Sequence, residues 1–327
     1  MRAGSKALSC QSACHLPDNL EQSRQNKVRA PECQSCHLGV LSTKAQNPFS
    51  QPKRSPRRLF ALTENASITK VKSQTQASPS EAPSESGTEN MAWVPGGEFI
   101  MGSNERWDDE GPEHIASVDG FYIDLYETTN ADYKKFVDAT QREAPYHWPN
   151  GEIPKGKGSD PVIYVNWFDA TDYCQWRGKR LPNEKEWEKA ARGENGLIYP
   201  WGDEWSLDRS NHPYKNSTGV EPVGSYPNGK SPYGLYDMSG NVWEWVDSFY
   251  LPHPGNNIHR SEYGTDKRLL KGGSWFDCLS YGCGLSAPTF NRSFFTPEVR
   301  NNSFGFRCAK SPSKAGAAAH SSAQSPG

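Results

Sequence analysis

The sequence predicts an α/β fold with sparse regular secondary structure and many ordered loops, and three observations support this prediction. Gly, Pro and Asn recur so often between residues 91 and 310 that few long elements fit. Only 34% of the residues are apolar, yet 11 Trp, 14 Tyr and 13 Phe, which cluster after Met91, supply much buryable area. Strand patterns and helix patterns both occur in the same stretch, which accounts for the α/β class.

The composition divides the chain of 327 residues into four parts. Residues 1–40 form a small cysteine cluster. Residues 41–90 are rich in Ser, Pro, Gln and Thr, and we expect a disordered linker because their apolar surface is too small to offset the entropy of ordering. Residues 91–310 are long enough to bury a sizeable core, and residues 311–327 are expected to be a disordered tail.

The elements expected within residues 91–310 are short. Strand patterns cover residues 91–101 and 117–126, and helix patterns cover residues 129–139, 166–177 and 183–192. Thr129 and Asn166 are suitable N-caps for the first two helices. The second helix carries Cys174, and the third places Trp187 and Ala191 one turn apart on one face.

The charge balance excludes some partners. The net charge is −2 and the isoelectric point is about 6.5, so no basic stripe is available to neutralise a run of phosphates. No stretch approaches the roughly 18 apolar residues of a membrane span, and the N-terminal region lacks the apolar centre of a secretory signal. We therefore expect no nucleic-acid partner and no membrane span.

Two thiols behind a Gly-Gly-Ser turn are the strongest candidates for chemistry. Cys278 and Cys283 are five positions apart and follow Ser274. Two thiolates brought together can bind a soft metal such as Cu(I), form a reversible disulfide, or divide the roles of nucleophile and resolving thiol. The alternatives are a structural disulfide between them or two unrelated buried thiols. Ser274 is a candidate to hydrogen-bond a thiolate or a substrate oxygen, or merely to satisfy the backbone of the turn.

The N-terminal cysteines have the pattern of covalent haem attachment. Cys33, Cys36 and His37 form a C-x-x-C-H motif, in which two thioethers anchor the porphyrin and the imidazole ligates iron. The same pattern recurs with one extra residue in Cys10, Cys14 and His15. Zinc held by the four thiolates is the alternative. Haem attachment requires export, so we expect an extracytoplasmic protein if the N-terminus is truncated and a cytoplasmic one otherwise.

Several ordered motifs resemble the formylglycine-generating enzyme, or sulfatase-modifying factor, domain family from about Met91 to Lys310. The matching segments begin with the entry strand at residues 94–103 and the helix cap at 126–130, and they continue through residues 178–188, 199–202, 234–245, 270–275 and 304–307. The resemblance implies a formylglycine-generating-enzyme fold, which is related to C-type lectins and belongs to the α/β class. It also implies structural calcium, which members of the family often contain.

The resemblance also implies an activity. In the family's oxidases, two cysteines after Gly-Gly-Ser bind Cu(I) and use dioxygen to oxidise a cysteine of a substrate peptide to formylglycine. Cys278 and Cys283 match that pair in their spacing. This chain departs from the oxidases in carrying one residue more between Ser274 and Cys278, and in having residues 284–290 where an arginine-rich segment normally follows. Both departures weaken the prediction that the substrate chemistry is the same.

Two further sites come from the resemblance. It joins Cys174 and Cys308 in a disulfide, whereas two separate buried thiols are the alternative. Closing a loop of over one hundred residues in this way stabilises by about 4 to 5 kcal/mol in the chain-entropy model. A structural calcium site is implied at a loop rich in carboxylates and carbonyls, with ordinary salt bridges as the alternative; its ligands are Asp237, Gly240, Val242 and Glu244.

The favoured prediction is therefore an oxidoreductase acting on a cysteine-containing protein or peptide. Cys278 and Cys283 are predicted to hold copper, while Ser274 and Trp243 shape the site, and an N-terminal haem would deliver electrons from an electron-transfer partner. The rival prediction is a non-catalytic lectin-like module that binds a ligand or protein. In that case the recognition surface would include Phe276, Leu279, Tyr281 and Phe290.

Overall fold

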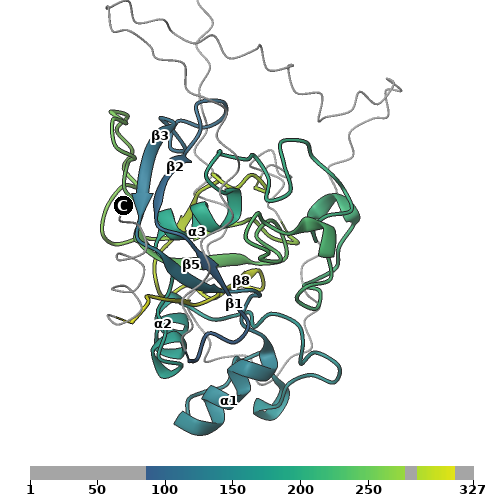
Figure 1. The fold of residues 1–327 in the computed structure, drawn as a ribbon. Coiled ribbons are helices and arrows are strands. Elements are labelled where there is room, and N and C mark those ends of the chain that lie inside the picture. The colour runs from purple at the N-terminus through teal and green to yellow at the C-terminus, as the bar shows by residue number, and fades with distance from the viewer. Residues whose placement is uncertain (1–85, 277–285, 314–327) are drawn as a thin grey trace, which may run out of the picture. The chain divides into compact units, whose positions relative to one another are not determined.

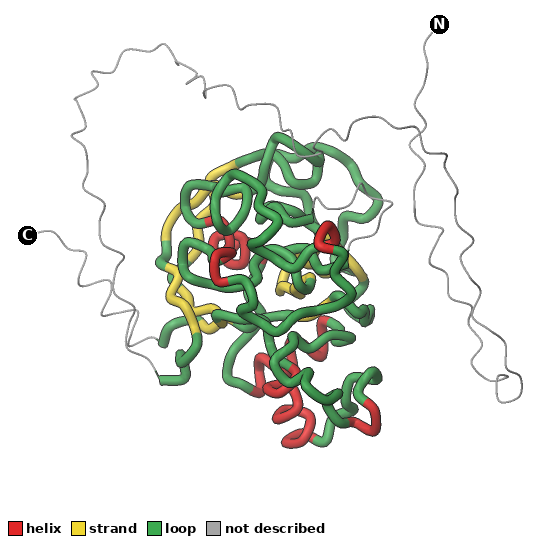
Figure 2. Tube along the Cα trace, turned by 90° about the vertical axis from the view of Figure 1, so that its right-hand side faces the viewer, coloured by secondary structure: helices red, strands yellow, loops and turns green. Residues whose placement is uncertain are grey.

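The computed structural model describes residues 86–276 and 286–313. Most of this part of the chain is loop, as Figure 2 shows. The β2–β3 hairpin lies at one end, α3 lies near the centre, and α1 and α2 lie at the opposite end (Figure 1). The α/β class with sparse regular structure is therefore confirmed.

Three small sheets contain the strands. The first has the order β1-β4-β9, the second pairs β2 with β3, and the third has the order β7-β6-β5-β8. The strands are β1 Met91–Val94, β2 Gly97–Met101, β3 His114–Val118, β4 Phe121–Asp124, β5 Trp243–Phe249, β6 Arg268–Lys271, β7 Ser293–Phe295, β8 Phe304–Gly305 and β9 Ala309–Lys310. All pairings are antiparallel except β5 with β8. Because β9 pairs with β4, the last strand closes the sheet that the first strand opened.

The two predicted strands were too long. Residues 91–101 form β1 and β2, which are separated by Pro95 and Gly96, because proline has no N–H to donate to a ladder. The second prediction, residues 117–126, is split between β3 and β4 by a turn at Gly120. A Cβ at Gly120 would lie only 2.5 Å from the ring of Trp93, so the break leaves no room for a side chain there.

The three helices begin and end within one residue or so of their predicted limits. They are α1 Asn130–Thr140, α2 Trp167–Trp176 and α3 Glu184–Arg192, with short 3₁₀ turns at Pro149–Gly151, Pro213–Lys215 and Pro227–Gly229. Thr129 caps α1 through its side chain. The caps of α2 and α3 are Asn166 and Asn183, each in a reciprocal capping box with an acidic residue three positions on. Side-chain chemistry at the N-caps therefore explains where the helices start.

Two cores lie on opposite faces of the β5–β6 pair. Trp245 and Leu270, which are cross-strand partners, face the core that includes α1 and α2. Val246 and Leu269 face the core that includes Trp187 of α3. Since successive residues of a strand point to opposite faces, this one strand pair supplies both cores.

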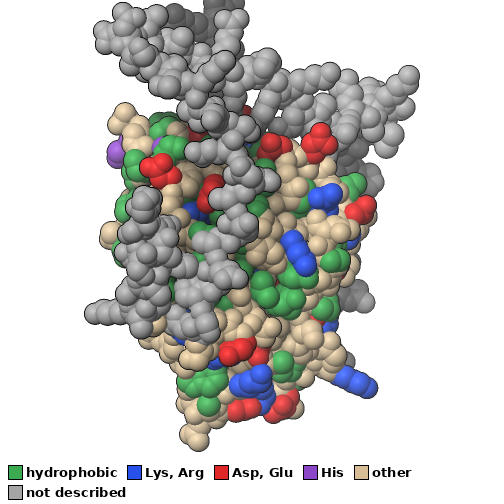
Figure 3. All heavy atoms as spheres, in the orientation of Figure 1, with side chains coloured by type: hydrophobic (Ala, Val, Ile, Leu, Met, Phe, Trp, Pro, Cys, Tyr) green, Lys and Arg blue, Asp and Glu red, His purple; other side chains and the backbone are tan. Residues whose placement is uncertain are grey.

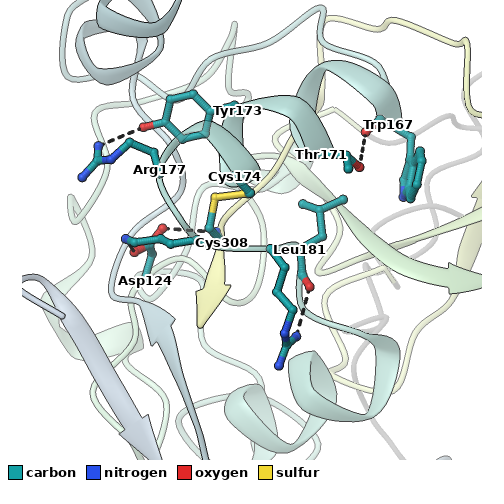
Figure 4. Close-up of a disulfide and its surroundings, with 10 residues drawn as sticks. Asp124, Trp167, Thr171, Tyr173, Cys174, Arg177, Leu181 and Cys308 are labelled. Carbon is teal, nitrogen blue, oxygen red and sulfur yellow. Dashed lines mark hydrogen bonds and ion pairs between the residues drawn. A yellow bond between two sulfur atoms is a disulfide. The ribbon is translucent and has the colours of Figure 1, made fainter. Parts of the chain in front are cut away.

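A disulfide joins Cys174 of α2 to Cys308, immediately before β9 (Figure 4). The two Cα atoms are 5.6 Å apart and the residues are 134 positions apart in sequence. This is the pairing that the family resemblance implies. The N–H of Cys308 donates to Asp124 at 3.2 Å, so the bridge is also tied to β4.

The surface has mixed charge. On the face in Figure 3, acidic and basic side chains of the described residues are interspersed and form no continuous basic stripe. No helix in residues 86–276 and 286–313 is long and apolar enough to cross a membrane.

Candidate active site

A tight turn follows β6 and carries the Gly-Gly-Ser motif. Gly272 and Gly273 have φ values of 92° and 75°, in the left-handed region that favours glycine. A Cβ at Gly273 would lie 2.8 Å from the backbone oxygen of Ser286, so Ser286 rests directly against the turn. The chain leaves this turn through Phe276, and Ser286 lies again beside Gly273. Cys278 and Cys283 belong to residues 277–285, outside the described residues.

The side chain of Ser274 forms hydrogen bonds within its own turn. Its side chain is 1% exposed. Its hydroxyl donates to the carbonyl of Phe276 at 2.5 Å and accepts from the N–H of Phe276 at 3.2 Å. Of the two roles predicted for Ser274, this geometry matches the satisfaction of turn backbone.

Trp243, at the start of β5, lies beside the turn, because Trp243 and Trp275 bond adjacent carbonyls of one segment. Its N–H donates to the carbonyl of Ser303 at 2.8 Å, and the indole N–H of Trp275 donates to the neighbouring carbonyl of Asn302 at 3.2 Å. The backbone N–H of Trp275 in turn donates to Asn241, two residues before Trp243. The structure thus brings Ser274, Trp275 and Trp243 into one hydrogen-bonded neighbourhood.

A buried cluster of charges in which each carboxylate is bonded by at least one cation adjoins the turn through Lys271. In this cluster, which we call the balanced cluster, the carboxylates are Glu184 and Glu188 and the cations are Arg192, Lys271 and Arg292. Lys271, the last residue of β6, bonds Glu188 at 3.0 Å with both side chains fully buried. Burial alone would raise the pKa of Glu188, but Lys271 and Arg192 outweigh it and lower the pKa.

A second buried cluster has an excess of acid. In this acid-rich cluster the carboxylates are Glu127, Asp237 and Glu244 and the cation is Arg307. Burial, with repulsion from Asp237 and Glu244, raises the pKa of Glu127 well above its usual range. Burial also raises the pKa of Asp237 to about 6. Three carboxylates face one guanidinium, so among the described residues this cluster holds more acidic groups than cations.

Two of the predicted calcium ligands, Asp237 and Glu244, belong to this acid-rich cluster, and they fit the ion unequally. Hard oxygen donors and an excess of negative charge suit Ca²⁺. However, both oxygens of Glu244 are already held: Arg307 donates to them at 2.7 and 2.8 Å, and the indole of Trp187 donates at 2.8 Å. Glu244 thus matches the alternative prediction of a salt bridge. Among the described residues, no three His, Cys, Asp or Glu side chains converge as a metal ion would require.

The sequence analysis missed Glu127 and Arg307 as members of this cluster. Asn241 donates its amide to Glu127 at 2.7 Å, and the N–H of Val242 donates to the same carboxylate at 3.2 Å. Both missed residues lie inside motifs that were recognised, residues 126–130 and 304–307. The signal available was therefore one charged residue of each sign, Glu127 among uncharged residues of the first motif and Arg307 at the end of the second.

One expected recognition residue is placed differently from the prediction. Phe276 is 53% exposed, as a recognition surface requires, but Phe290 is 5% exposed and packs with Ile198, Tyr199 and Ala287. The prediction that Phe290 is presented on the surface is wrong, because it fills a small aromatic core. Leu279, Tyr281 and the N-terminal motifs that contain Cys10, Cys14, His15, Cys33, Cys36 and His37 lie outside the described residues.

Known proteins share this architecture. The family model described as sulfatase-modifying factor enzyme 1-like domain matches residues 75–312. The chain is 35% identical over 274 residues to inactive C-alpha-formylglycine-generating enzyme 2 of Mus musculus, covering 68% of this chain and 85% of that protein. It is 32% identical over 285 residues to formylglycine-generating enzyme of Mus musculus, covering 67% and 74%. The structure of PvdO from Pseudomonas aeruginosa superposes with a TM-score of 0.54 at 26% identity, covering 68% of this chain and 94% of that chain.

Proposed function

Since the chain belongs to the sulfatase-modifying factor enzyme 1-like family, we propose that it is an oxidoreductase of the formylglycine-generating type. The observation that carries the proposal is the anchoring of the candidate segment. Gly273 and Ser286 lie in contact, so the segment that bears Cys278 and Cys283 starts and ends at one place. Cys174 and Cys308 are joined to each other, and so neither competes for these two thiols.

Copper is the metal that this donor set suits. Two thiolates are soft ligands and favour Cu(I) over hard cations. When bound, copper would supply the activation of dioxygen. The overall reaction balances as one cysteine thiol, one O₂, two electrons and two protons giving one aldehyde, one H₂S and one water. The two electrons come from a thiol reductant or, in the cell, from an electron-transfer partner.

The chain's own residues would hold the substrate peptide and exclude water. Ser274 keeps the turn rigid through its bonds with Phe276, and the balanced cluster fixes the end of β6 beneath it. Trp243 and Trp275 are half-buried and lie next to this turn. Preorganised side chains of this kind reduce the entropy lost when a peptide binds.

Copper binding tests the proposal directly. The full chain with serine in place of Cys10, Cys14, Cys33 and Cys36 would be titrated anaerobically with Cu(I) against a competing chelator. We expect one tightly bound copper per chain, and we expect Cys278→Ser or Cys283→Ser to abolish it. Mass spectrometry of cysteine-containing peptides, incubated with the copper-loaded protein, O₂ and a thiol, then reports conversion to the aldehyde. Absence of copper binding by the unmodified thiol pair would overturn the proposal.

A non-catalytic binding module is the second candidate. It is favoured by the 35% identity to a relative named as inactive, and by the extra residue before Cys278. In that case Cys278 and Cys283 would form a disulfide that stabilises a recognition surface. Thiol counting before and after mild reduction separates the two candidates, because a structural disulfide resists mild reductant and the copper site requires free thiols.

Calcium at the acid-rich cluster is a further part of the proposal. Asp237 and the carbonyls of Gly240 and Val242 would supply hard oxygen ligands, while Glu244 stays paired with Arg307. The excess of carboxylates over cations in the cluster supports a cation there. Metal analysis of the protein, purified without chelator, would give about one calcium per chain, and its absence would contradict this part.

The N-terminal motifs lead to a proposal about cofactor and compartment together. We propose haem c at Cys33, Cys36 and His37, and at Cys10, Cys14 and His15, with zinc as the alternative. Covalent haem would place the protein outside the cytoplasm and give it an electron source. An absorption spectrum of the full chain with metal analysis decides between the two, because a Soret band indicates haem and zinc without that band contradicts it.

A further inference from the structure

A strained tyrosine lies close to the candidate site. Seven non-glycine residues in the described chain have a positive φ, and six of them are Asn, Asp or Gln, which tolerate the left-handed region. The seventh is Tyr164, with φ of 58°. A bulky side chain in this region is strained, and such strain clusters at functional sites.

The surroundings of Tyr164 enforce this conformation. Val162 and Val165, on either side of it, are 0% and 1% exposed. Val162 donates its N–H to Thr128, and the carbonyl of Val165 accepts from the indole of Trp245 at 3.1 Å. Since both flanking residues are fixed in the interior, the chain between them must turn sharply and direct the Tyr164 ring outward.

The Tyr164 ring joins two others at the surface. Its centroid is 4.4 Å from that of Tyr146 and 4.9 Å from that of His147. Tyr146 is 70% exposed, the largest exposed fraction among the exposed large apolar side chains of the described residues. We call Tyr146, His147 and Tyr164 the aromatic surface.

This aromatic surface is continuous with the candidate site. The N–H of Tyr164 donates to the carbonyl of Asn301 at 2.9 Å. The next two carbonyls along the chain, those of Asn302 and Ser303, accept from Trp275 and Trp243. Three successive peptide groups therefore link Tyr164 of the aromatic surface to the indole of Trp275 and to the backbone of Trp243, beside the Gly-Gly-Ser turn.

The aromatic surface is also electrically neutral. In the described part of the chain, no ion pair or hydrogen bond joins its three rings to a charged side chain, and Tyr146 bonds Tyr164 through the phenols. Burial lowers the pKa of His147, which keeps the imidazole uncharged near neutral pH. An apolar side chain is therefore a better match than a charged one.

We propose that the aromatic surface binds a bulky apolar side chain of the peptide substrate and so contributes to substrate selection. The inference rests on the proposed function, because the peptide is the one whose cysteine would be oxidised. Tyr146 and Tyr164 supply the contact area, while the strained backbone at Tyr164 keeps its ring in place.

Binding measured apart from oxidation tests the inference. The probes are fluorescent peptides with serine in place of the central cysteine and with Phe, Ala, Lys or Glu placed two to four positions to either side. With the full chain we expect at least one position where Phe binds about tenfold more tightly than Ala, Lys or Glu. Tyr146→Ala and Tyr164→Asn should each remove this preference. Ile115→Ala, an exposed apolar residue on β3 at the opposite end of the domain, should leave it unchanged.

The Tyr164→Asn variant separates a binding role from a structural one. Asparagine tolerates a positive φ, so the urea midpoint should stay the same or rise while the preference for Phe is lost. A lowered midpoint together with an unchanged preference would overturn the inference, as would equal binding of all four peptides. If the preference is present and no cysteine peptide is ever oxidised, the proposed oxidase fails and the binding surface stands.

Discussion

The two buried charge clusters differ in how their charges are matched. In the balanced cluster, Glu188 is bonded by both Lys271 and Arg192, and its pKa is lowered. In the acid-rich cluster, three carboxylates share Arg307, and the pKa values of Glu127 and Asp237 are raised. Both clusters are equally deep, so burial does not explain the difference. In the balanced cluster every carboxylate is bonded by a cation, whereas in the acid-rich cluster only Glu244 is, and Glu127 and Asp237 accept from neutral N–H groups.

The largest expected effect comes from removing the cation of the acid-rich cluster. Arg307→Leu would leave three buried carboxylates without a guanidinium and should lower the free energy of unfolding by about 3 to 5 kcal/mol. Equilibrium urea unfolding with the disulfide intact measures this. Arg300→Leu is the matched control: Arg300 is half exposed and pairs with Asp169, so its loss should cost less than about 1 kcal/mol. Equal losses for the two variants would contradict the prediction.

Removing one cation of the balanced cluster should have a smaller effect. Lys271→Met leaves Glu188 bonded to Arg192, so we expect a loss of about 2 to 3 kcal/mol. The double variant Lys271→Met with Glu188→Gln should lose less than the sum of the two single variants, because the single changes remove the same pair. Additive losses in urea unfolding would show that the two side chains are not coupled.

The two clusters should give opposite dependences on pH. The pKa of Asp237 is raised from 3.8 to about 6, so between these values the folded protein holds a proton that the unfolded chain releases. Its contribution to stability therefore falls as pH rises through this window and is lost above about pH 6, a change of roughly 1 to 3 kcal/mol. The pKa of Glu188 is lowered from 4.5, so its contribution is present above that value and is lost as pH falls.

Two variants test which cluster causes each change of the free energy of unfolding with pH. Asp237→Asn should reduce the loss of stability between pH 4.5 and 6.5, to which Glu127 also contributes, and Glu188→Gln should reduce the loss on further acidification, to which Glu184 also contributes. Both are measured as urea unfolding at a series of pH values with chelator present. A wild-type protein that gains stability on going from pH 4.5 to 6.5, and an Asp237→Asn variant that behaves in the same way, would contradict the assignment.

The smallest expected effect is stabilisation by added calcium. If the ion completes the acid-rich cluster, calcium at ten times its dissociation constant should raise the free energy of unfolding by about 1.4 kcal/mol at neutral pH. Asp237→Asn should abolish this gain, whereas Glu188→Gln should preserve it. Thermal unfolding with calcium, with magnesium and with chelator provides the measurement, and an equal gain in both variants would place the ion elsewhere.

Local patterns in the sequence predicted the helices better than the strands and the charge clusters, and the disulfide pairing came from the family resemblance. The helix periodicity, with the cap at Thr129, is a local signal, and it located the helices to within about a residue. Glu127 and Arg307 are brought together by pairing between distant strands, which composition and periodicity do not encode. Tyr164 is harder still, because its strain is set by neighbours on both sides and by Asn301, far along the chain.

The contact between Gly273 and Ser286 has a consequence for how this chain can change over time. Nine residues separate Phe276 from Ser286, and Ser286 lies against Gly273 of the turn. The two ends of this segment are therefore held together whatever its length. By the chain-closure relation, one added residue in such a segment costs only about 0.1 kcal/mol. An insertion before Cys278 is therefore nearly neutral for stability. The segment between Phe276 and Ser286 can change in length and sequence, and with it the substrate preference, while the rest of the domain stays the same.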